Sequence, residues 1–199
     1  MKKLLLFLLV VVVLMLAGLW SFLKTSKGFS AREQPSALEA GIARRLRTLA
    51  MPPAALAAKN PVVASPEVLT EARHHFADHC ATCHANDGSG NTPIGQNFYS
   101  KAPDMRRPET QSLTDGELYY IIHNGVRLTG MPAWGASDQD EGSWKLVWFI
   151  RQLPQLPPED LRDMEKFNPR SPHEIEEEKQ EEDFLNGKAP GPAGNAHHH

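Results

Sequence analysis

The sequence predicts a small all-α domain, preceded by an apolar helix and followed by an acidic helical extension. Three segments within about 90 residues of the middle of the chain carry apolar residues at helical spacing. No segment alternates apolar and polar residues as a half-buried strand would. So small a helical domain buries a modest core, and such domains are commonly completed by a cofactor, a metal or disulfides.

The first segment, residues 1–23, is predicted to be a transmembrane helix. An apolar run from Leu4 to Leu23 follows two lysines, and a helix of this length spans about 30 Å, the thickness of a bilayer hydrocarbon core. A cleaved signal peptide is the alternative, but its apolar region is shorter, roughly 7–15 residues, and ends at a small-x-small site that is poorly formed here. Lysines flank the run on both sides, so charge does not indicate the orientation.

Residues 24–65 are predicted to form a tether that contains one short basic helix. Its apolar side chains recur near helical spacing: Leu38, Ile42, Leu46 and Leu49. Pro52 and Pro53 end the helix. One interpretation places this helix on anionic lipid headgroups. The other is a short helix that packs on the domain or is loosely solvated, and the small number of apolar positions favours it.

The domain is predicted to cover residues 66–157 and to open with a helix at Pro66. Ser65 is a typical N-cap, and proline suits the first helical position. The residues that share one face of this helix are Leu69, Ala72, Phe76 and Cys80. No periodic pattern covers residues 86–112, which are expected to be a glycine-rich loop.

Two further helices complete the predicted domain. Thr114 and Glu117 form a capping box for the second, whose apolar face comprises Leu118, Ile121, Ile122 and Val126. The third covers about 143–153, and prolines follow it. Its apolar face comprises Leu146, Phe149, Ile150 and Leu153.

Residues 158–199 are expected to be an acidic helical extension and a disordered tail. Residues 159–183 include eleven acidic and four basic residues, and Ser171 with Glu174 forms another capping box. A solvated helix is the favoured interpretation, with a docking surface for a basic partner as the alternative. We assign no role to the terminal histidines, His197–His199.

The overall charge argues against binding to nucleic acid. The formal net charge is −3, and the sequence has no basic stripe that would meet phosphates.

The two cysteines lie in one motif, Cys80-Ala81-Thr82-Cys83-His84. This is the C-x-x-C-H attachment sequence of c-type haem. On a helix the spacing places both thiols on one side, where they can reach the two vinyl groups of one porphyrin, and the next residue brings an imidazole under the iron. A zinc site would lack ligands, and a thioredoxin-type pair would lack its βαβ context.

One covalently bound haem c is therefore expected, with His84 as the proximal iron ligand. The second ring nitrogen of such a histidine normally donates a hydrogen bond that fixes the ring plane. The carbonyl of Pro103, in the loop after the haem helix, is the candidate acceptor.

The sixth iron ligand is expected to be a methionine. Three histidines precede the motif on the same helix and cannot reach the opposite haem face: His74, His75 and His79. His123 follows Ile121 and Ile122 and is better explained as a surface or core-edge residue. Of six methionines, only Met105 and Met131 lie between the motif and the end of the domain. Met131 is favoured because Gly130 allows close backbone approach and Pro132 stiffens the turn.

These segments resemble the class I cytochrome c family over residues 66–157, and most closely its membrane-tethered bacterial members with one haem. The resemblance rests on four stretches: C-A-T-C-H with the glycine-rich loop, A-P-D-M, I-I-H-N-G-V-R-L-T-G-M-P-A-W, and W-K-L-V-W-F-I-R-Q-L. By resemblance, Met131 is the axial methionine, Met105 is a packing residue, and the Pro103 carbonyl accepts the histidine proton. Phe76 would pack against the last helix near residues 148–149.

The resemblance implies an electron carrier rather than an enzyme, without catalytic residues or a small-molecule substrate. His/Met ligation would fill both axial positions and favour a high reduction potential. We therefore expect a redox protein as donor and another as acceptor, with the haem domain on the periplasmic side of the cell membrane. The alternatives are a haem subunit of a larger oxidoreductase complex, a haem enzyme, and a gas sensor whose methionine leaves the iron. Four basic residues either form a docking rim or are ordinary surface charges: Lys101, Arg106, Arg107 and Arg127.

Overall fold

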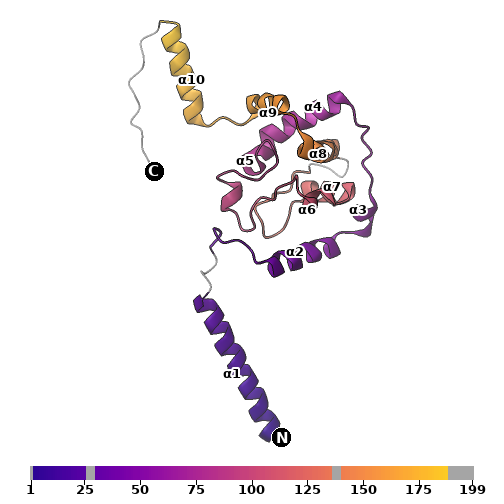
Figure 1. Ribbon diagram of the computed structural model, residues 1–199, viewed down its shortest axis with the longest axis vertical. Coiled ribbons are helices and arrows are strands. Elements are labelled where there is room, and N and C mark those ends of the chain that lie inside the picture. The colour runs from indigo at the N-terminus through magenta and orange to yellow at the C-terminus, as the bar shows by residue number, and fades with distance from the viewer. Residues whose placement is uncertain (1, 26–29, 136–139, 188–199) are drawn as a thin grey trace.

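A computed structural model describes residues 2–25, 30–135 and 140–187. Every regular element in these ranges is helical and none is a strand, which confirms the predicted all-α class. Figure 1 shows a helical body from which the first helix, α1, and the last, α10, project.

Helix α1 (Lys2–Thr25) is the apolar helix expected at the amino terminus. Its stretch Lys2–Lys24 is long and apolar enough to cross a membrane, and none of that stretch is buried within the molecule. An N-terminal signal sequence has the same properties. The helix therefore suggests a single-pass membrane anchor, and the side of the membrane is a separate question.

The segment expected to be a tether forms helices α2 (Ala37–Ala50) and α3 (Pro53–Ala57). Figure 1 shows both running beside the helical body. Three hydrogen bonds fasten the stretch after α2: the Thr114 hydroxyl donates to the Leu56 carbonyl (3.3 Å), the Asn60 amide to the Trp144 carbonyl (2.8 Å), and the Trp148 indole to the Val62 carbonyl (2.9 Å). Residues 56–62 are therefore attached to the domain, which the sequence pattern did not predict.

The first helix of the domain starts as predicted. Ser65 accepts a hydrogen bond from the Val68 amide (3.2 Å) and caps α4 (Pro66–His75). The helix continues as a π-helical turn, η1 (Phe76–Cys80), and then as α5 (Ala81–His84).

The predicted loop contains two short elements, the 3₁₀ turn η2 (Gly95–Asn97) and helix α6 (Pro108–Gln111). Elements of three or four residues are too short to produce a recognisable period, so the sequence did not indicate them.

Helix α7 (Asp115–Asn124) has the predicted capping box, with Thr114 and Glu117 bonded reciprocally. The helix ends at Gly125, whose φ of 65° is easily adopted only by glycine, so Val126 lies beyond the helix on which it was placed. Helix α8 (Glu141–Gln152) is capped by Asp140 and continues as the 3₁₀ turn η3 (Leu153–Gln155).

The core lies mainly between α4 and α8, the helix pair with the most extensive contact. The Phe76 and Phe149 rings meet with centroids 4.9 Å apart at 55°, so the first helix packs on the last as the resemblance implied. Both side chains are fully buried. The haem motif begins at Cys80, four positions after Phe76, so this packing fixes the start of the motif against α8.

The core continues past the boundary expected at residue 157. Helix α9 (Pro158–Met164) and the 3₁₀ turn η4 (Glu165–Phe167) fold back on α4, and Met164 is completely buried in the core. His74 donates through Nε2 to the Asp163 carboxylate (3.1 Å), and its ring stacks on the Phe167 ring with centroids 3.7 Å apart. Helix α10 (Pro172–Leu185) has the predicted capping box and no buried residue, as expected of a solvated helix. The terminal residues 188–199 lie outside the described ranges.

Candidate functional site

The predicted haem-attachment residues lie at the junction of η1 and α5. Cys80 ends the π turn, and Cys83 and His84 follow in α5. A π turn widens a helix by one residue and is often found at functional sites. Both cysteines are free thiols, three residues apart on one side of the helical path.

The environment keeps both thiols protonated at neutral pH. Burial, with a smaller effect of Cys83, raises the pKa of Cys80 to about 12, and burial also raises the pKa of Cys83. A reactive dithiol such as that of thioredoxin instead needs a lowered cysteine pKa. The pair is therefore poorly suited to thiol–disulfide exchange by itself.

His84 is a buried, neutral imidazole. It is 8% exposed, and burial lowers its pKa to about 4. Its Nδ1 atom is buried and has no hydrogen-bond partner. A neutral ring nitrogen is what a metal ligand must offer, and an unpaired buried polar atom is costly unless a bound group compensates for it.

The carbonyl expected to receive the His84 proton lies close to the turn after the motif. Gly90 donates its amide hydrogen to the His84 carbonyl (2.8 Å). A Cβ atom on Gly90, whose φ is +70°, would lie 2.5 Å from the Ala102 carbonyl oxygen and 3.1 Å from that of Pro103. Glycine thus lets residues 102–103 lie against this turn. The hydrogen bond from Nδ1 to Pro103 is not formed here.

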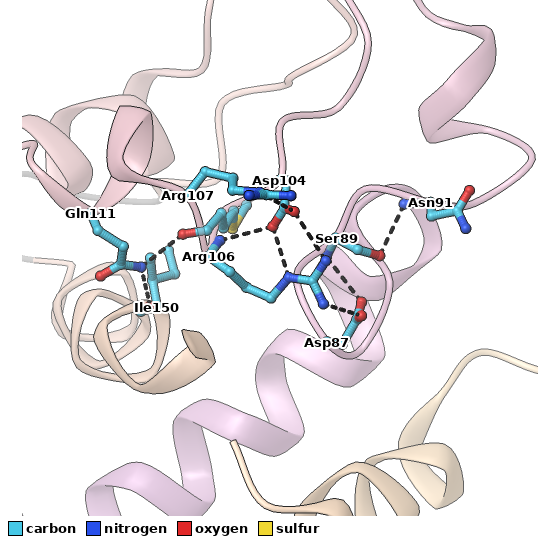
Figure 2. A network of polar contacts seen from close by, with 9 residues as sticks. Asp87, Ser89, Asn91, Asp104, Arg106, Arg107, Gln111 and Ile150 are labelled. Carbon is cyan, nitrogen blue, oxygen red and sulfur yellow. Dashed lines mark hydrogen bonds and ion pairs between the residues drawn. The ribbon is translucent and has the colours of Figure 1, made fainter. Parts of the chain in front are cut away.

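We call the segment between the haem motif and Met105 the haem-motif loop. Contacts between charged side chains join its two ends, as Figure 2 shows. Arg106 donates through Nη1 to Asp87 (2.8 Å) and through Nε and Nη2 to Asp104 (2.8 and 3.0 Å). Hydrogen bonding by Arg106 holds the pKa of Asp104 at about 2, despite an opposing effect of burial. The loop is therefore pinned at both ends by one guanidinium group.

Met105 belongs to the hydrophobic core. It is 9% exposed, and its amide donates to the Gly88 carbonyl (2.8 Å). Gln111 donates through Nε2 to the carbonyls of both Met105 (2.7 Å) and Ile150 (2.8 Å), which ties this backbone to α8 (Figure 2).

Met131 lies on a loop that folds back along the end of α7. Its carbonyl accepts from the Val126 amide (3.1 Å), and the Trp134 amide donates to the Ile122 carbonyl (3.1 Å). A Cβ atom on Gly125 would lie 2.7 Å from the Met131 carbonyl oxygen, so glycine is needed where this loop begins. The Met131 side chain is only partly buried.

Two aromatic contacts bring the Met131 loop towards the haem motif. The Trp134 ring meets the ring of His79, the residue before Cys80, edge-on, with the two centroids 5.7 Å apart. A Cβ atom on Gly130 would lie 2.7 Å from the Phe98 ring, so this ring covers the glycine next to Met131. No periodic sequence pattern indicates these contacts of Trp134 and Phe98, because both residues lie in loops.

Residues 67–150 match the family described as cytochrome C oxidase, cbb3-type, subunit III. The matched stretch contains the whole motif, both candidate methionines and the helix pair that forms the core. The chain carries a class I c-type cytochrome domain. A comparison with curated proteins finds no match to this chain.

A c-type cytochrome domain implies a covalently bound haem. The residues of this cytochrome domain fit such a group, because they offer two protonated thiols and a neutral, buried imidazole with an unpaired nitrogen. Cys80 and Cys83 are the only cysteines in the sequence, so they are the only pair that can form the thioethers.

Proposed function

We propose that this cytochrome domain carries single electrons between redox proteins, with one haem c joined to Cys80 and Cys83 and ligated by His84 and Met131. The observation that carries the proposal is the buried, neutral His84 beside two thiols on one helical path. When bound, the haem supplies an iron centre that gains and loses one electron. The chain's residues attach, ligate and bury this group, and no catalytic residue is assigned.

The environment of His84 supports its role as proximal ligand. Its Nδ1 atom has no acceptor here, and the Pro103 carbonyl lies against the same turn. We propose that Nδ1 donates to this carbonyl in the haem-bound protein, which would fix the tautomer and strengthen the ligand.

The positions of the two methionines support Met131 as the sixth ligand. Met105 is held in the core and by two backbone hydrogen bonds, so its side chain is part of the packing. Met131 is partly exposed on a loop that approaches the motif through Trp134 and His79. If His84 and Met131 both bind the iron, they would leave it no site for a substrate.

Replacing each methionine in turn tests this assignment. The ferric wild type is expected to show the far-red methionine-to-iron charge-transfer band, and the reduced protein to be inert to carbon monoxide. Met131→Ala should lose the band and bind carbon monoxide, because it opens the sixth position. Both properties are read by absorption spectroscopy.

Met105→Ala is the matched control for that substitution. It should keep the band but lose about 2–5 kcal/mol of unfolding free energy, since it leaves a cavity in the core. A wild-type protein without the band contradicts methionine ligation, and a band that survives Met131→Ala assigns the iron to Met105.

We further propose that α1 anchors the protein in the cell membrane with the haem domain on the periplasmic side. The length and composition of α1 support the anchor, and the placement of c-type haem outside the cytoplasmic membrane supports the side. Protease added to intact spheroplasts should remove the haem domain. Resistance there, with cleavage only after lysis, would place the domain inside.

A haem subunit of a larger oxidoreductase complex is the second candidate function. The description of the matched family, which names an oxidase subunit, favours it. Purification of the intact protein after mild membrane extraction should then recover stoichiometric partner subunits. Recovery of the cytochrome alone supports a separate carrier.

The charged residues expected at the docking rim are not equivalent. Arg106 forms ion pairs with Asp87 and Asp104. Arg107 also forms an ion pair with Asp104, with its Nε atom 3.3 Å from the carboxylate. Arg127, exposed on the Met131 loop, is the rim residue that we propose contacts a redox partner.

A further inference from the structure

Helix α2 turns its apolar side chains away from the rest of the molecule. Leu38, Ile42, Leu46 and Leu49 are 74, 49, 59 and 81% exposed. At about 100° per residue, these four side chains lie within roughly 80° of the helix circumference. We call these four residues the apolar stripe.

The opposite side of α2 is the partly buried one. The residues of α2 that are partly buried are Ala40, Gly41, Arg47 and Thr48. Burial lowers the pKa of Arg47, and attraction to the nearby Glu117 of α7 partly offsets that effect. A helix that belongs only to a soluble domain would bury its leucines and expose its arginines. Helix α2 instead exposes its leucines and partly buries Arg47.

The other described residues leave the stripe uncovered. The shallow groove along it is lined by residues of α2 and its N-cap alone: Ser36, Leu38, Glu39, Ile42, Ala43 and Leu46. No side chain of the haem site lines this groove. A continuous exposed apolar surface normally marks contact with another molecule or with a membrane.

Continuity with α1 and the charge of the segment favour a lipid surface as the occupant. Eleven residues separate Thr25, the last residue of α1, from Ala37. An extended chain of this length covers at most about 40 Å, so α2 lies within that distance of the end of α1. Residues 24–50 contain six lysines and arginines and two glutamates. Arg44 and Arg45 are exposed and have no ion-pair partner within the described ranges. Basic residues beside an apolar stripe suit anionic headgroups.

We propose that α2 lies in the headgroup region of the bilayer that α1 spans, with the apolar stripe inserted about 5–10 Å below the surface. The inference rests on the proposed membrane anchor. Helix α2 and the segment before it are joined to the haem-motif loop, because Tyr99 donates to Glu39 and Lys101 donates to the Ala31 carbonyl (3.2 Å). The side of the cytochrome domain that carries α2 is thus held against the membrane, and the domain does not move freely at the end of a long tether.

Site-specific labels on the full-length haem protein test this orientation. The thioethers leave no native thiol free, so one new cysteine accepts an environment-sensitive fluorophore. Leu46→Cys places the label on the stripe, and Val63→Cys is the control because Val63 is apolar and 82% exposed but lies outside α2. Val12→Cys labels α1. The protein is reconstituted into phosphatidylglycerol-containing vesicles with brominated acyl chains.

The label at residue 46 should be blue-shifted and quenched several-fold more by the brominated lipid than the label at residue 63. If the label at 12 is quenched but that at 46 behaves like that at 63, the anchor holds and α2 docking is wrong. If neither 12 nor 46 is quenched, both the anchor and the docking fail. If the label at residue 46 is protected from quenching by aqueous iodide but is not quenched by the brominated lipid, another protein or a second copy of this chain covers the apolar stripe, and the membrane proposal is wrong.

The arginines supply a second readout. Arg44→Gln with Arg45→Gln should reduce lipid quenching at residue 46, and raising the salt concentration should reduce it in the wild type, because salt screens the attraction to anionic headgroups. Arg162→Gln, at an exposed position on α9, is the control for loss of a positive charge elsewhere on the surface and should leave the quenching at residue 46 unchanged. Equal quenching in vesicles with and without anionic lipid would overturn the electrostatic part of the proposal.

Discussion

At the scale of single residues, a few polar atoms shape the haem-motif loop. Arg106 bridges Asp87 and Asp104, which lie 17 positions apart at the two ends of that loop. A guanidinium that bonds one carboxylate through two nitrogens makes a stronger and more directional contact than an ordinary surface pair. These bonds therefore join the two ends of the loop.

We expect Asp104 to make stability depend on pH at the acid end. Its pKa is about 2 in the folded protein, against an ordinary value of 3.8. Because the folded pKa is the lower one, its contribution is fully present above about pH 4 and is lost as the pH falls towards 2. Asp104→Asn should lower the unfolding free energy by about 1 kcal/mol at neutral pH, and by much less near pH 2.

Urea unfolding of the haem protein at several pH values measures this difference. Glu181→Gln, on the exposed helix α10, is the control and should leave the profile unchanged. A constant difference between Asp104→Asn and the wild type from pH 7 down to pH 2 would contradict the role of the Asp104 carboxylate.

At the scale of elements, α9 belongs to the cytochrome domain although its sequence reads as the start of an acidic extension. Arg73 of α4 pairs with Asp160 and Asp163, and Met164 is inserted beneath them into the core. Asp160 and Asp163 thus attach α9 to the basic C-terminal end of α4. Only α10 has the fully solvated character expected of the whole extension.

Met164→Ala tests whether α9 contributes to the stability of the domain. The side chain is completely buried, so its truncation should cost about 2–5 kcal/mol of unfolding free energy. Ile175→Ala on α10 is the control, because Ile175 is 55% exposed, and it should change stability by less than about 0.5 kcal/mol. Equal effects in chemical denaturation would show that α9 is not part of the cooperative unit.

At the scale of the whole molecule, the segment after the membrane helix is fastened to the domain at several places. The closest approach lies where α3 crosses α7: a Cβ atom on Gly116 would sit 1.9 Å from the Ala55 carbonyl oxygen. Only glycine fits at that position. This attachment shortens the part of the chain that is free to act as a tether and sets the position of the domain relative to α2.

Gly116→Ala should therefore detach α3 from α7. Alanine favours a helix over glycine by about 1 kcal/mol, but the clash with backbone should exceed this gain, as overpacking typically costs about 1–3 kcal/mol. Amide hydrogen exchange should become faster in residues 55–62. Gly41→Ala in α2 is the control, because nothing lies within 4 Å of its added Cβ, and it should stabilise the protein slightly. Unchanged exchange in Gly116→Ala would contradict tight docking of α3.

Local sequence signals were sufficient for the longer helices and for the attachment motif. The capping residues Ser65, Thr114 and Ser171 start helices as predicted, because a cap depends only on atoms within one turn. The spacing of Cys80, Cys83 and His84 likewise needs nothing beyond one helical turn. The preference for Met131 over Met105 needed the family resemblance, and the burial of Met105 now supports it.

The sequence by itself determined the helices, the haem motif and the apolar first segment. Only the tertiary structure decided that Met164 joins the core, that residues 56–62 are attached to the domain, and that α2 exposes its leucines. The physical reason is that periodicity identifies which side chains share a face of a helix, but contains no information about what covers that face. That depends on residues far apart in the chain, and for the apolar stripe of α2 we infer that it depends on the membrane.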